Sequence, residues 1–253
     1  MPAREEIDIT IIPGWNLRQI AADWQKKGLI KNEDEFYKRV GKPAYDYAAN
    51  GQKAPILSFT DSYGKDLYPL LVTKQKGVSY EGYFFPDTYR VYKDAKLEDI
   101  LDKIFTNLED KITVEIRTEI NKQKNNLFTI LTIASLVEKE ARTEKDMKIV
   151  ADIFWRRYEK GWALQSCASV NYVTGKNTPA VSAEDQLIES LYNTYKYSGL
   201  PLGPIGNPSL TAIKAALYPE KNSYWYFMTG IDGKMRYAST LDEHNANVWR
   251  YLR

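Results

Sequence analysis

Alternation between apolar and polar positions opens the chain. Residues 7–11 read Ile-Asp-Ile-Thr-Ile, a period of two that predicts a half-buried strand. Over residues 17–24 the apolar positions instead recur at i, i+3, i+4 and i+7. This spacing predicts an amphipathic helix with Asn16 as its cap and Gly28 as its stop. Residues 42–76 show no sustained period and are interrupted by glycine and proline, so we expect them to be mostly irregular.

The pattern changes after Gly77, where an aromatic segment leads into further periodic segments. Along the whole chain, further helices are predicted at residues 32–40, 97–108, 126–142, 144–159 and 209–217. A strand at 224–228 is predicted to pair with one near 235–237, and a capping box at 240–243 opens a last helix. This order predicts an α+β fold. We expect a small N-terminal α/β subdomain at residues 1–79 and a larger mixed α+β domain at residues 80–253.

Composition narrows the possible chemistry. Lys and Arg (35) nearly balance Asp and Glu (33), and the net charge of +2 gives no reason to expect nucleic acid as a partner. Cys167 is the only cysteine and His244 the only histidine, which removes disulfides, Cys/His zinc sites and histidine-based triads from consideration. We therefore expect no metal and no cofactor, and acid–base chemistry falls to carboxylates. No apolar run is long enough to span a bilayer.

One carboxylate falls among apolar positions of a predicted helix. At about 100° per residue, Ile133, Leu136 and Val137 lie within roughly 60° of Glu140, whereas Glu138 lies almost opposite. A carboxyl group among such side chains is desolvated, which raises its pKa and keeps it protonated, as a general acid requires.

A plainer interpretation of Glu140 remains open on periodicity alone. Glu140 would then end the helix and form an ion pair with Arg142 or Lys145 at the surface.

The sequence Ala-Ser-Leu-Val-Glu-Lys-Glu-Ala at residues 134–141 resembles the motif of the MltG (YceG-like) endolytic murein transglycosylases. In that family the second glutamate of the Glu-Lys-Glu run is catalytic, and it matches Glu140. Further blocks resemble the family in the same order: residues 81–89, 164–166, 192–195, 199–208 and 243–245.

The resemblance implies an enzyme that cuts peptidoglycan strands with one glutamic acid on a lysozyme-like catalytic helix of the 80–253 domain. The acid protonates the glycosidic bond after N-acetylmuramic acid. The sugar's own primary hydroxyl then attacks the anomeric carbon and leaves a 1,6-anhydro end without water. Because this tethered hydroxyl replaces a second carboxylate, Glu140 alone can serve as acid and base.

Polar and apolar residues of the matching blocks are the predicted substrate contacts. Gln165, Tyr192 and Asn193 carry amide and phenol groups that can bond to N-acetyl and hydroxyl groups, although an interior hydrogen-bond network explains them nearly as well. The predicted substrate-binding residues are Glu81, Tyr89, Gln165, Ser166, Tyr192, Asn193, Tyr195, Leu200, Pro201 and Asn207.

Proline and glycine alternate through residues 198–209, which predicts a stiff wall beside a cleft or a connector that shapes the helix start at Ser209. With the aromatic block at 80–89 on the other side of Glu140, the wall would form an open groove. An open groove favours internal, endolytic cleavage.

The resemblance also implies a place of action and partners. Family members begin with a transmembrane anchor and a LysM-like subdomain, so we expect a catalytic domain at the outer face of the inner (cytoplasmic) membrane, held by an anchor absent from this chain. The expected partners are peptidoglycan glycan strands, with peptidoglycan synthases as further candidates. Where the family usually has Asp, this chain has Cys167.

Two other functions remain to be separated by experiment. A lysozyme-type hydrolase would use Glu138, Asp146 or another acid as the second carboxylate and would add water to its products. A noncatalytic peptidoglycan-binding or scaffold protein of the elongation machinery would bind strands without cutting them.

Overall fold

The first strand finds its partner far along the chain. The computed structural model describes residues 4–252, and in it β1 (Glu6–Thr10) pairs antiparallel with β2 (Thr88–Tyr92). Ile9 stands opposite Tyr89, and both side chains are buried. The strand predicted at the start of the chain is therefore confirmed, one residue earlier than expected.

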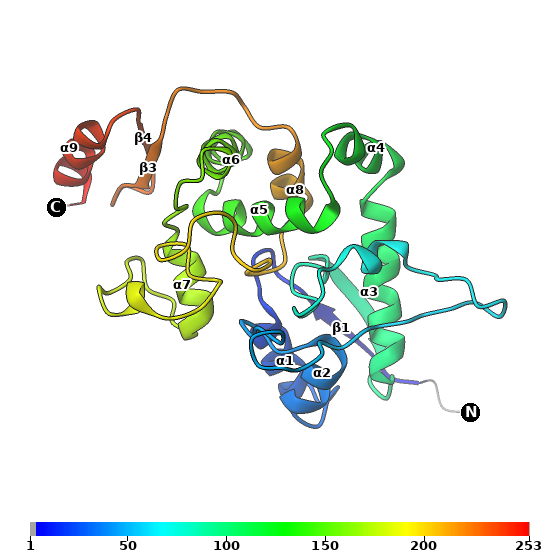
Figure 1. Cartoon of the computed structure of the whole chain (residues 1–253). Helices are drawn as coiled ribbons and strands as arrows, with labels where there is room; N and C mark the ends of the chain where they lie inside the picture. Colours follow the sequence, from blue (N-terminus) through cyan, green and yellow to red (C-terminus); the bar gives the residue numbers. More distant parts are fainter. Residues whose placement is uncertain (1–3, 253) are drawn as a thin grey trace.

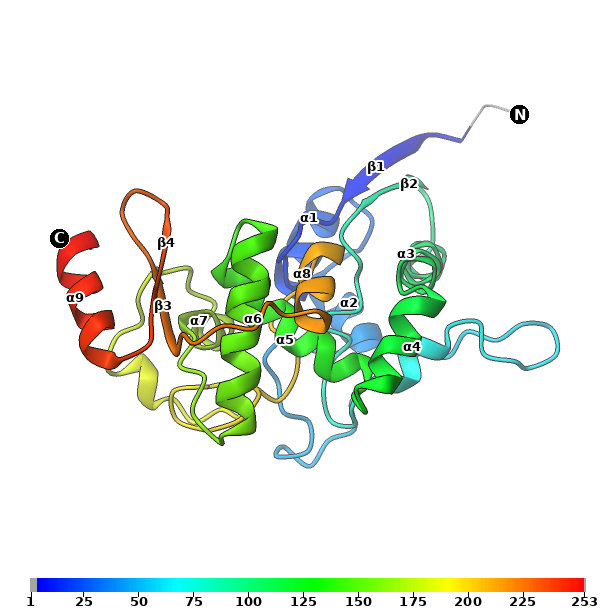
Figure 2. The ribbon, with the colours of Figure 1, turned by 90° about the horizontal axis from the view of Figure 1, so that it is seen from above.

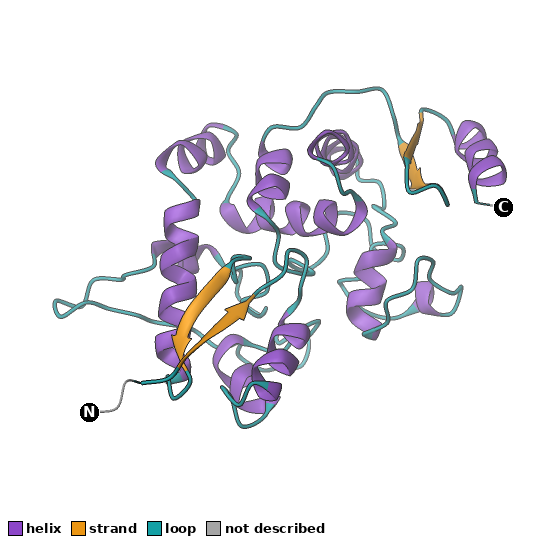
Figure 3. Cartoon of the chain, turned by 180° about the vertical axis from the view of Figure 1, so that it is seen from behind, coloured by secondary structure: helices purple, strands orange, loops and turns teal. Residues whose placement is uncertain are grey.

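Helices dominate the rest of the described chain (Figure 1), and the two strand pairs lie apart from each other (Figure 3). The second pair joins β3 (Tyr226–Thr229) to β4 (Met235–Ala238). The helices are α1 (Leu17–Lys26), α2 (Glu33–Val40), α3 (Leu97–Lys111), α4 (Val114–Lys122), α5 (Leu127–Glu140), α6 (Glu144–Glu159), α7 (Cys167–Thr174), α8 (Leu210–Leu217) and α9 (Leu241–Tyr251), with short 3₁₀ turns η1 (Pro69–Thr73) and η2 (Asp185–Leu187). The predicted α+β class is confirmed.

The predicted signals at α1 act as expected. The Asn16 side chain accepts hydrogen bonds from the N–H groups of Arg18 and Gln19, which satisfies donors that a helix start leaves free. The apolar face of α1 is buried, and the ring of Trp24 meets that of Phe36 edge-on at 5.3 Å. The helix is thus fixed by its cap and by an aromatic core.

The α5 helix lies at the centre of the molecule (Figures 1 and 2). It packs against α4, α6, α7 and α8. From Leu127 to Val137 every side chain except that of Thr129 is buried, so the helix is covered on all sides rather than along one stripe. It ends at Glu140, two residues before the predicted end, because Ala141 takes up extended backbone angles.

Residues on both sides of position 79/80 share one hydrophobic cluster. Phe84 packs against Phe36 of α2 and Phe105 of α3, with ring centroids 5.6 Å apart in both cases. The Tyr80 N–H also donates to the Val40 carbonyl at 2.7 Å. The proposed division into residues 1–79 and 80–253 stays a prediction, and its two sides are joined by these contacts.

The segment at residues 42–76 is mostly irregular, as expected. Part of it projects beyond α3 as an extended loop (Figures 1 and 2). Within residues 4–252, no helix has both the length and the apolar character needed to cross a bilayer.

Candidate active site

Glu140 is the last residue of α5, where the chain turns away from the helix axis. The residue is half-buried, and the Ser166 hydroxyl donates to its Oε1 at 2.5 Å. Burial of the carboxyl group raises the pKa of Glu140 above its ordinary value, while the Ser166 hydroxyl lowers it to a smaller extent. Residues 4–252 form no other hydrogen bond to this carboxyl group, which leaves Oε2 available to a ligand.

Ser166 is the N-cap of α7, yet its hydroxyl does not cap that helix. It is directed to Glu140 instead. Thr194 holds the surrounding loop, because its carbonyl accepts the Gln165 N–H at 3.0 Å and its Oγ1 accepts the Ser166 N–H at 3.1 Å. Gln165 is exposed and has a left-handed backbone, with φ at 53°.

Cys167 and Tyr195 lie beside the same carboxylate. The Cys167 Sγ is 3.1 Å from the Tyr195 hydroxyl. Burial raises the pKa of Tyr195, and the hydrogen bond with Cys167 and the charge of Glu140 raise it further. Tyr195 is therefore a neutral hydroxyl near Glu140, and together with Ser166 and Gln165 it belongs to the part of the predicted set that the fold gathers around this carboxylate.

Glu81 lies in the interior, away from solvent. Its carboxylate accepts from the Leu17 N–H at 3.2 and 3.1 Å, from the Tyr172 hydroxyl at 2.9 Å and from Asn207 Nδ2 at 3.1 Å. Burial raises the pKa of Glu81 to about 7, although the Leu17 and Tyr172 hydrogen bonds lower it. Asn207 also uses Oδ1 to accept the N–H groups of Gly82 and Phe84, at 2.9 and 3.0 Å.

Further predicted contacts are also packed inside. The Tyr89 hydroxyl donates to the Phe85 carbonyl at 2.5 Å. Asn193 Nδ2 donates to two backbone carbonyls at 2.9 Å, and the ring of Tyr192 packs against Tyr172 with centroids 5.2 Å apart. Substrate contact by these residues, and by buried Glu81 and Asn207, stays a prediction. In the described structure their polar partners are protein groups.

The two segments expected to flank an open groove, residues 80–89 and 198–209, are largely packed against each other. Pro201 is buried and Leu200 is half-buried. A side chain at Gly82 would come within 2.7 Å of Pro204, so the aromatic block and the proline-rich segment press directly on each other. Residues 80–85 are interior packing rather than an exposed wall, because their aromatic side chains complete the core.

The other candidate carboxylates are already engaged. Glu138 Oε2 accepts the N–H and the hydroxyl of Ser209, at 2.8 and 2.5 Å, and so joins α5 to the start of α8. Asp146 accepts from the Thr143 hydroxyl at 2.6 Å and from the Tyr237 hydroxyl at 2.5 Å. The surface ion pair of Glu140 with Arg142 or Lys145 does not form among the described residues.

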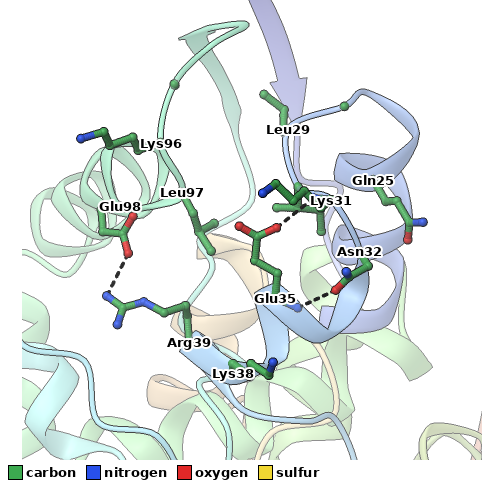
Figure 4. Close-up of a pocket in the computed structure, with 13 residues that line it drawn as sticks. Gln25, Leu29, Lys31, Asn32, Glu35, Lys38, Arg39, Lys96, Leu97 and Glu98 are labelled. Atoms are coloured by element: carbon green, nitrogen blue, oxygen red, sulfur yellow. Dashed lines mark hydrogen bonds and ion pairs between the residues drawn. The ribbon is translucent and has the colours of Figure 1, made fainter.

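A surface hollow of about 930 Å³ lies between α1, α2 and the start of α3 (Figure 4). Its charged lining includes Lys31, Lys38 and Lys96, together with the ion pair of Arg39 and Glu98 at 3.1 Å. None of the predicted site residues lines this hollow. Within residues 4–252, no cluster of three or more His, Cys, Asp or Glu side chains could hold a metal ion.

Similarity to known proteins covers almost the whole chain. The model of the YceG-like family matches residues 2–250. The chain is 34% identical, over 254 residues, to the endolytic murein transglycosylase of Bacillus subtilis strain 168, and 32% identical, over 252 residues, to that of Streptococcus pneumoniae R6. Each alignment covers 96% of this chain, but only 65% of the B. subtilis relative and 44% of the S. pneumoniae one.

A solved structure gives a matching fold. The crystal structure of a yceG-like protein from Listeria monocytogenes superposes with a TM-score of 0.74 at 29% sequence identity. The match covers 97% of this chain and 76% of that protein.

Proposed function

The chain belongs to the YceG-like family, and we propose that it is the catalytic part of an endolytic murein transglycosylase in which Glu140 is the single general acid and base. The observation that carries the proposal is the desolvated carboxyl group of Glu140, held by one hydrogen bond from Ser166 at the end of a buried helix. The relatives that bear this name are longer than the chain, so its activity and substrate remain proposals.

In the proposed reaction, Glu140 begins protonated and transfers its proton to the glycosidic oxygen after N-acetylmuramic acid. The bond from the anomeric carbon to that oxygen breaks, and the proton leaves on the departing sugar. The Glu140 carboxylate then takes the proton of the primary hydroxyl as its oxygen bonds to the anomeric carbon. One carboxyl group is regenerated in its acidic form, and no water is consumed.

The two influences on Glu140 suit these two steps. Burial favours the acid that gives the proton, and the Ser166 hydroxyl stabilises the carboxylate that remains. A hydrolase would need a second carboxylate, and the two named candidates, Glu138 and Asp146, accept hydrogen bonds from Ser209 and Tyr237.

The decisive experiment compares Glu140→Gln with Glu138→Gln on un-crosslinked glycan strands, with the products analysed by mass. We expect the wild type to give anhydro ends without added water, and Glu140→Gln to lose at least about 100-fold in rate because it has no transferable proton. Glu138→Gln should keep cutting. Glu140→Gln should also melt at no lower temperature, since a desolvated carboxylate is removed.

Three results would count against the proposal. Wild-type turnover by Glu140→Gln would remove Glu140 as the acid. Products heavier by one water would indicate a hydrolase, and tight binding without any cleavage would indicate a scaffold protein.

The same digestion tests endolytic cutting. Internal cleavage shortens long strands before disaccharides accumulate, whereas cleavage from an end releases disaccharides at once. Early release of disaccharides would contradict the endolytic proposal without affecting the role of Glu140.

Peptidoglycan lies outside the cytoplasmic membrane, so we propose action at the outer face of that membrane, with peptidoglycan synthases as candidate partners. In the native cell, protease added to intact spheroplasts should degrade the protein. Protection from the protease would contradict this location.

A further inference from the structure

Two tryptophan rings lie against each other at the surface near the loop that carries Ser166. Trp162 and Trp225 have ring centroids 4.7 Å apart and planes inclined by 34°. Trp162 follows α6 and is 44% exposed, and Trp225 immediately precedes β3 and is half-buried. A large aromatic ring this exposed leaves apolar surface in water, which is a common property of ligand-stacking sites.

Arginines of α6 fix the geometry of the pair. The buried guanidinium of Arg157 donates to the Leu164 carbonyl at 2.9 Å and to the Trp225 carbonyl at 3.0 and 2.6 Å. The Arg157 carbonyl accepts the Trp162 N–H at 2.8 Å. Arg156 lies over the Trp225 ring, 4.5 Å from its centroid. The two rings are therefore held in place before any ligand arrives.

The same loop leads directly to the candidate catalytic carboxylate. Trp162 and Ser166 are four positions apart in the chain, so their Cα atoms are no more than about 14 Å apart. Gln165, with an exposed amide, lies between them. The hairpin that follows Trp225 lies on the same side of the molecule as α7, opposite α3 and α4 (Figures 1 and 2).

We propose that Trp162, supported from behind by Trp225, forms a sugar-stacking subsite for the same glycan strand that Glu140 cuts, on a sugar ring beyond the scissile bond. The inference rests on the proposed function and specifies where the strand continues. The apolar face of a pyranose stacks on an aromatic ring, and the Gln165 amide can bond to an N-acetyl group. The nearby cations are occupied: Arg157 by carbonyl oxygens and Arg156 by Asp152 at 2.9 Å. The surface therefore suits a neutral sugar better than an acidic peptide.

The test measures binding and turnover separately, with un-crosslinked glycan strands as the probe. In the Glu140→Gln background, Trp162→Ala should raise the Kd about tenfold, and Trp162→Phe should recover most of the affinity. In the otherwise wild-type chain, Trp162→Ala should raise KM with little change in kcat, because the subsite lies away from the reacting atoms. The matched control is Trp249→Ala, since Trp249 is 67% exposed on α9.

The outcomes separate this inference from the proposed function. If the wild type cuts strands and Trp162→Ala binds as tightly as Trp249→Ala, the proposed subsite is wrong but the proposed transglycosylase activity is supported. If the wild type binds strands without cutting them and Trp162→Ala weakens binding, the sugar-binding subsite is supported and the proposed catalytic activity is contradicted. If the wild type does not bind the strands at all, both fall.

Discussion

Glu140 is a carboxyl group under two opposed influences, and its neighbours decide how far its pKa rises. Burial pushes the pKa up, and the single donor, Ser166, draws it down. Cys167 is the first residue of α7 and touches Tyr195, whose hydroxyl lies close enough to Glu140 for the two to interact by charge. A change of charge at position 167 should therefore change the pKa of Glu140.

We predict that Cys167→Asp folds and shifts the alkaline limb of the pH–rate profile upward. A carboxylate in the first turn of α7 is favourable to the helix. Its negative charge raises the pKa of Glu140, so the acid stays protonated to higher pH. The measurement is kcat/KM against pH.

The control at this position is Cys167→Ser, which keeps a small, uncharged group. It should leave both the rate and the pH profile nearly unchanged. Large losses of activity in both variants would show that the thiol itself has a role.

At the scale of elements, α5 and α7 meet through one side chain. The Ser166 hydroxyl gives up the usual capping bond of α7 in order to donate to Glu140. The helix start is still held, because the Ser166 carbonyl accepts the Ser169 hydroxyl at 2.8 Å. Removing the Ser166 hydroxyl should therefore disturb the chemistry more than the fold.

We predict that Ser166→Ala raises the pKa of Glu140 and lowers the rate. The loss of a donor to the carboxylate leaves burial unopposed, so the alkaline limb should move to higher pH. The maximal rate should fall about tenfold or more, because the carboxylate left after proton transfer is less stable. An unshifted alkaline limb would show that Ser166 does not tune Glu140.

The elements differ in how well local sequence predicts them. The cap at Asn16 and the capping box at Thr240 depend on residues three or four positions apart, and both are found. The predicted hairpin is found as β3 and β4. In contrast, β2, α4 and α7 are not predicted. β2 pairs with the distant β1 and α7 packs against α5, whereas α4 has a local signal, the Thr113 cap, that the apolar pattern alone does not bring out.

The candidate site shows the same limit. The motif singles out Glu140, which is the last residue of a buried helix. The apolar pattern predicts one inward-facing stripe, however, whereas α5 is covered on all sides from Leu127 to Val137. No local pattern indicated that Thr194 would hold the Gln165–Ser166 loop, or that Glu138 would bind Ser209. Both are contacts between residues 28 or more positions apart.

At the scale of the whole molecule, Glu81 and Asn207 join segments that are far apart in sequence. Glu81 receives donors from the start of α1, from Tyr172 of α7 and from Asn207. The Asn207 N–H and Nδ2 both donate to the Trp15 carbonyl, at 2.8 and 2.9 Å. We therefore expect the two sides of position 79/80 to unfold together.

We predict that the free energy of unfolding falls as pH rises from about 5 to 8, partly through Glu81. Its pKa is about 7 in the folded protein against an ordinary 4.5, so the folded state holds a proton that the unfolded chain releases. This contribution is full below about 4.5 and is lost as pH rises through 7. Its size is at most about 3 kcal/mol.

Urea unfolding of the wild type and Glu81→Gln at several pH values measures this contribution. The wild type should lose more free energy of unfolding over this range than the variant does. Glu138→Gln provides the control, because its dependence on pH should follow that of the wild type. Parallel curves for the wild type and Glu81→Gln would contradict the prediction.

The burial of α5 from Leu127 to Val137 also affects how the protein unfolds. A helix covered on every side exchanges its amide hydrogens only when the surrounding core opens, so α5 should be among the last segments to exchange. The candidate acid is thus attached to the most persistent part of the fold. Because the loop that carries Ser166 is also held, by Thr194, we expect the strand rather than the acid to move between successive cuts.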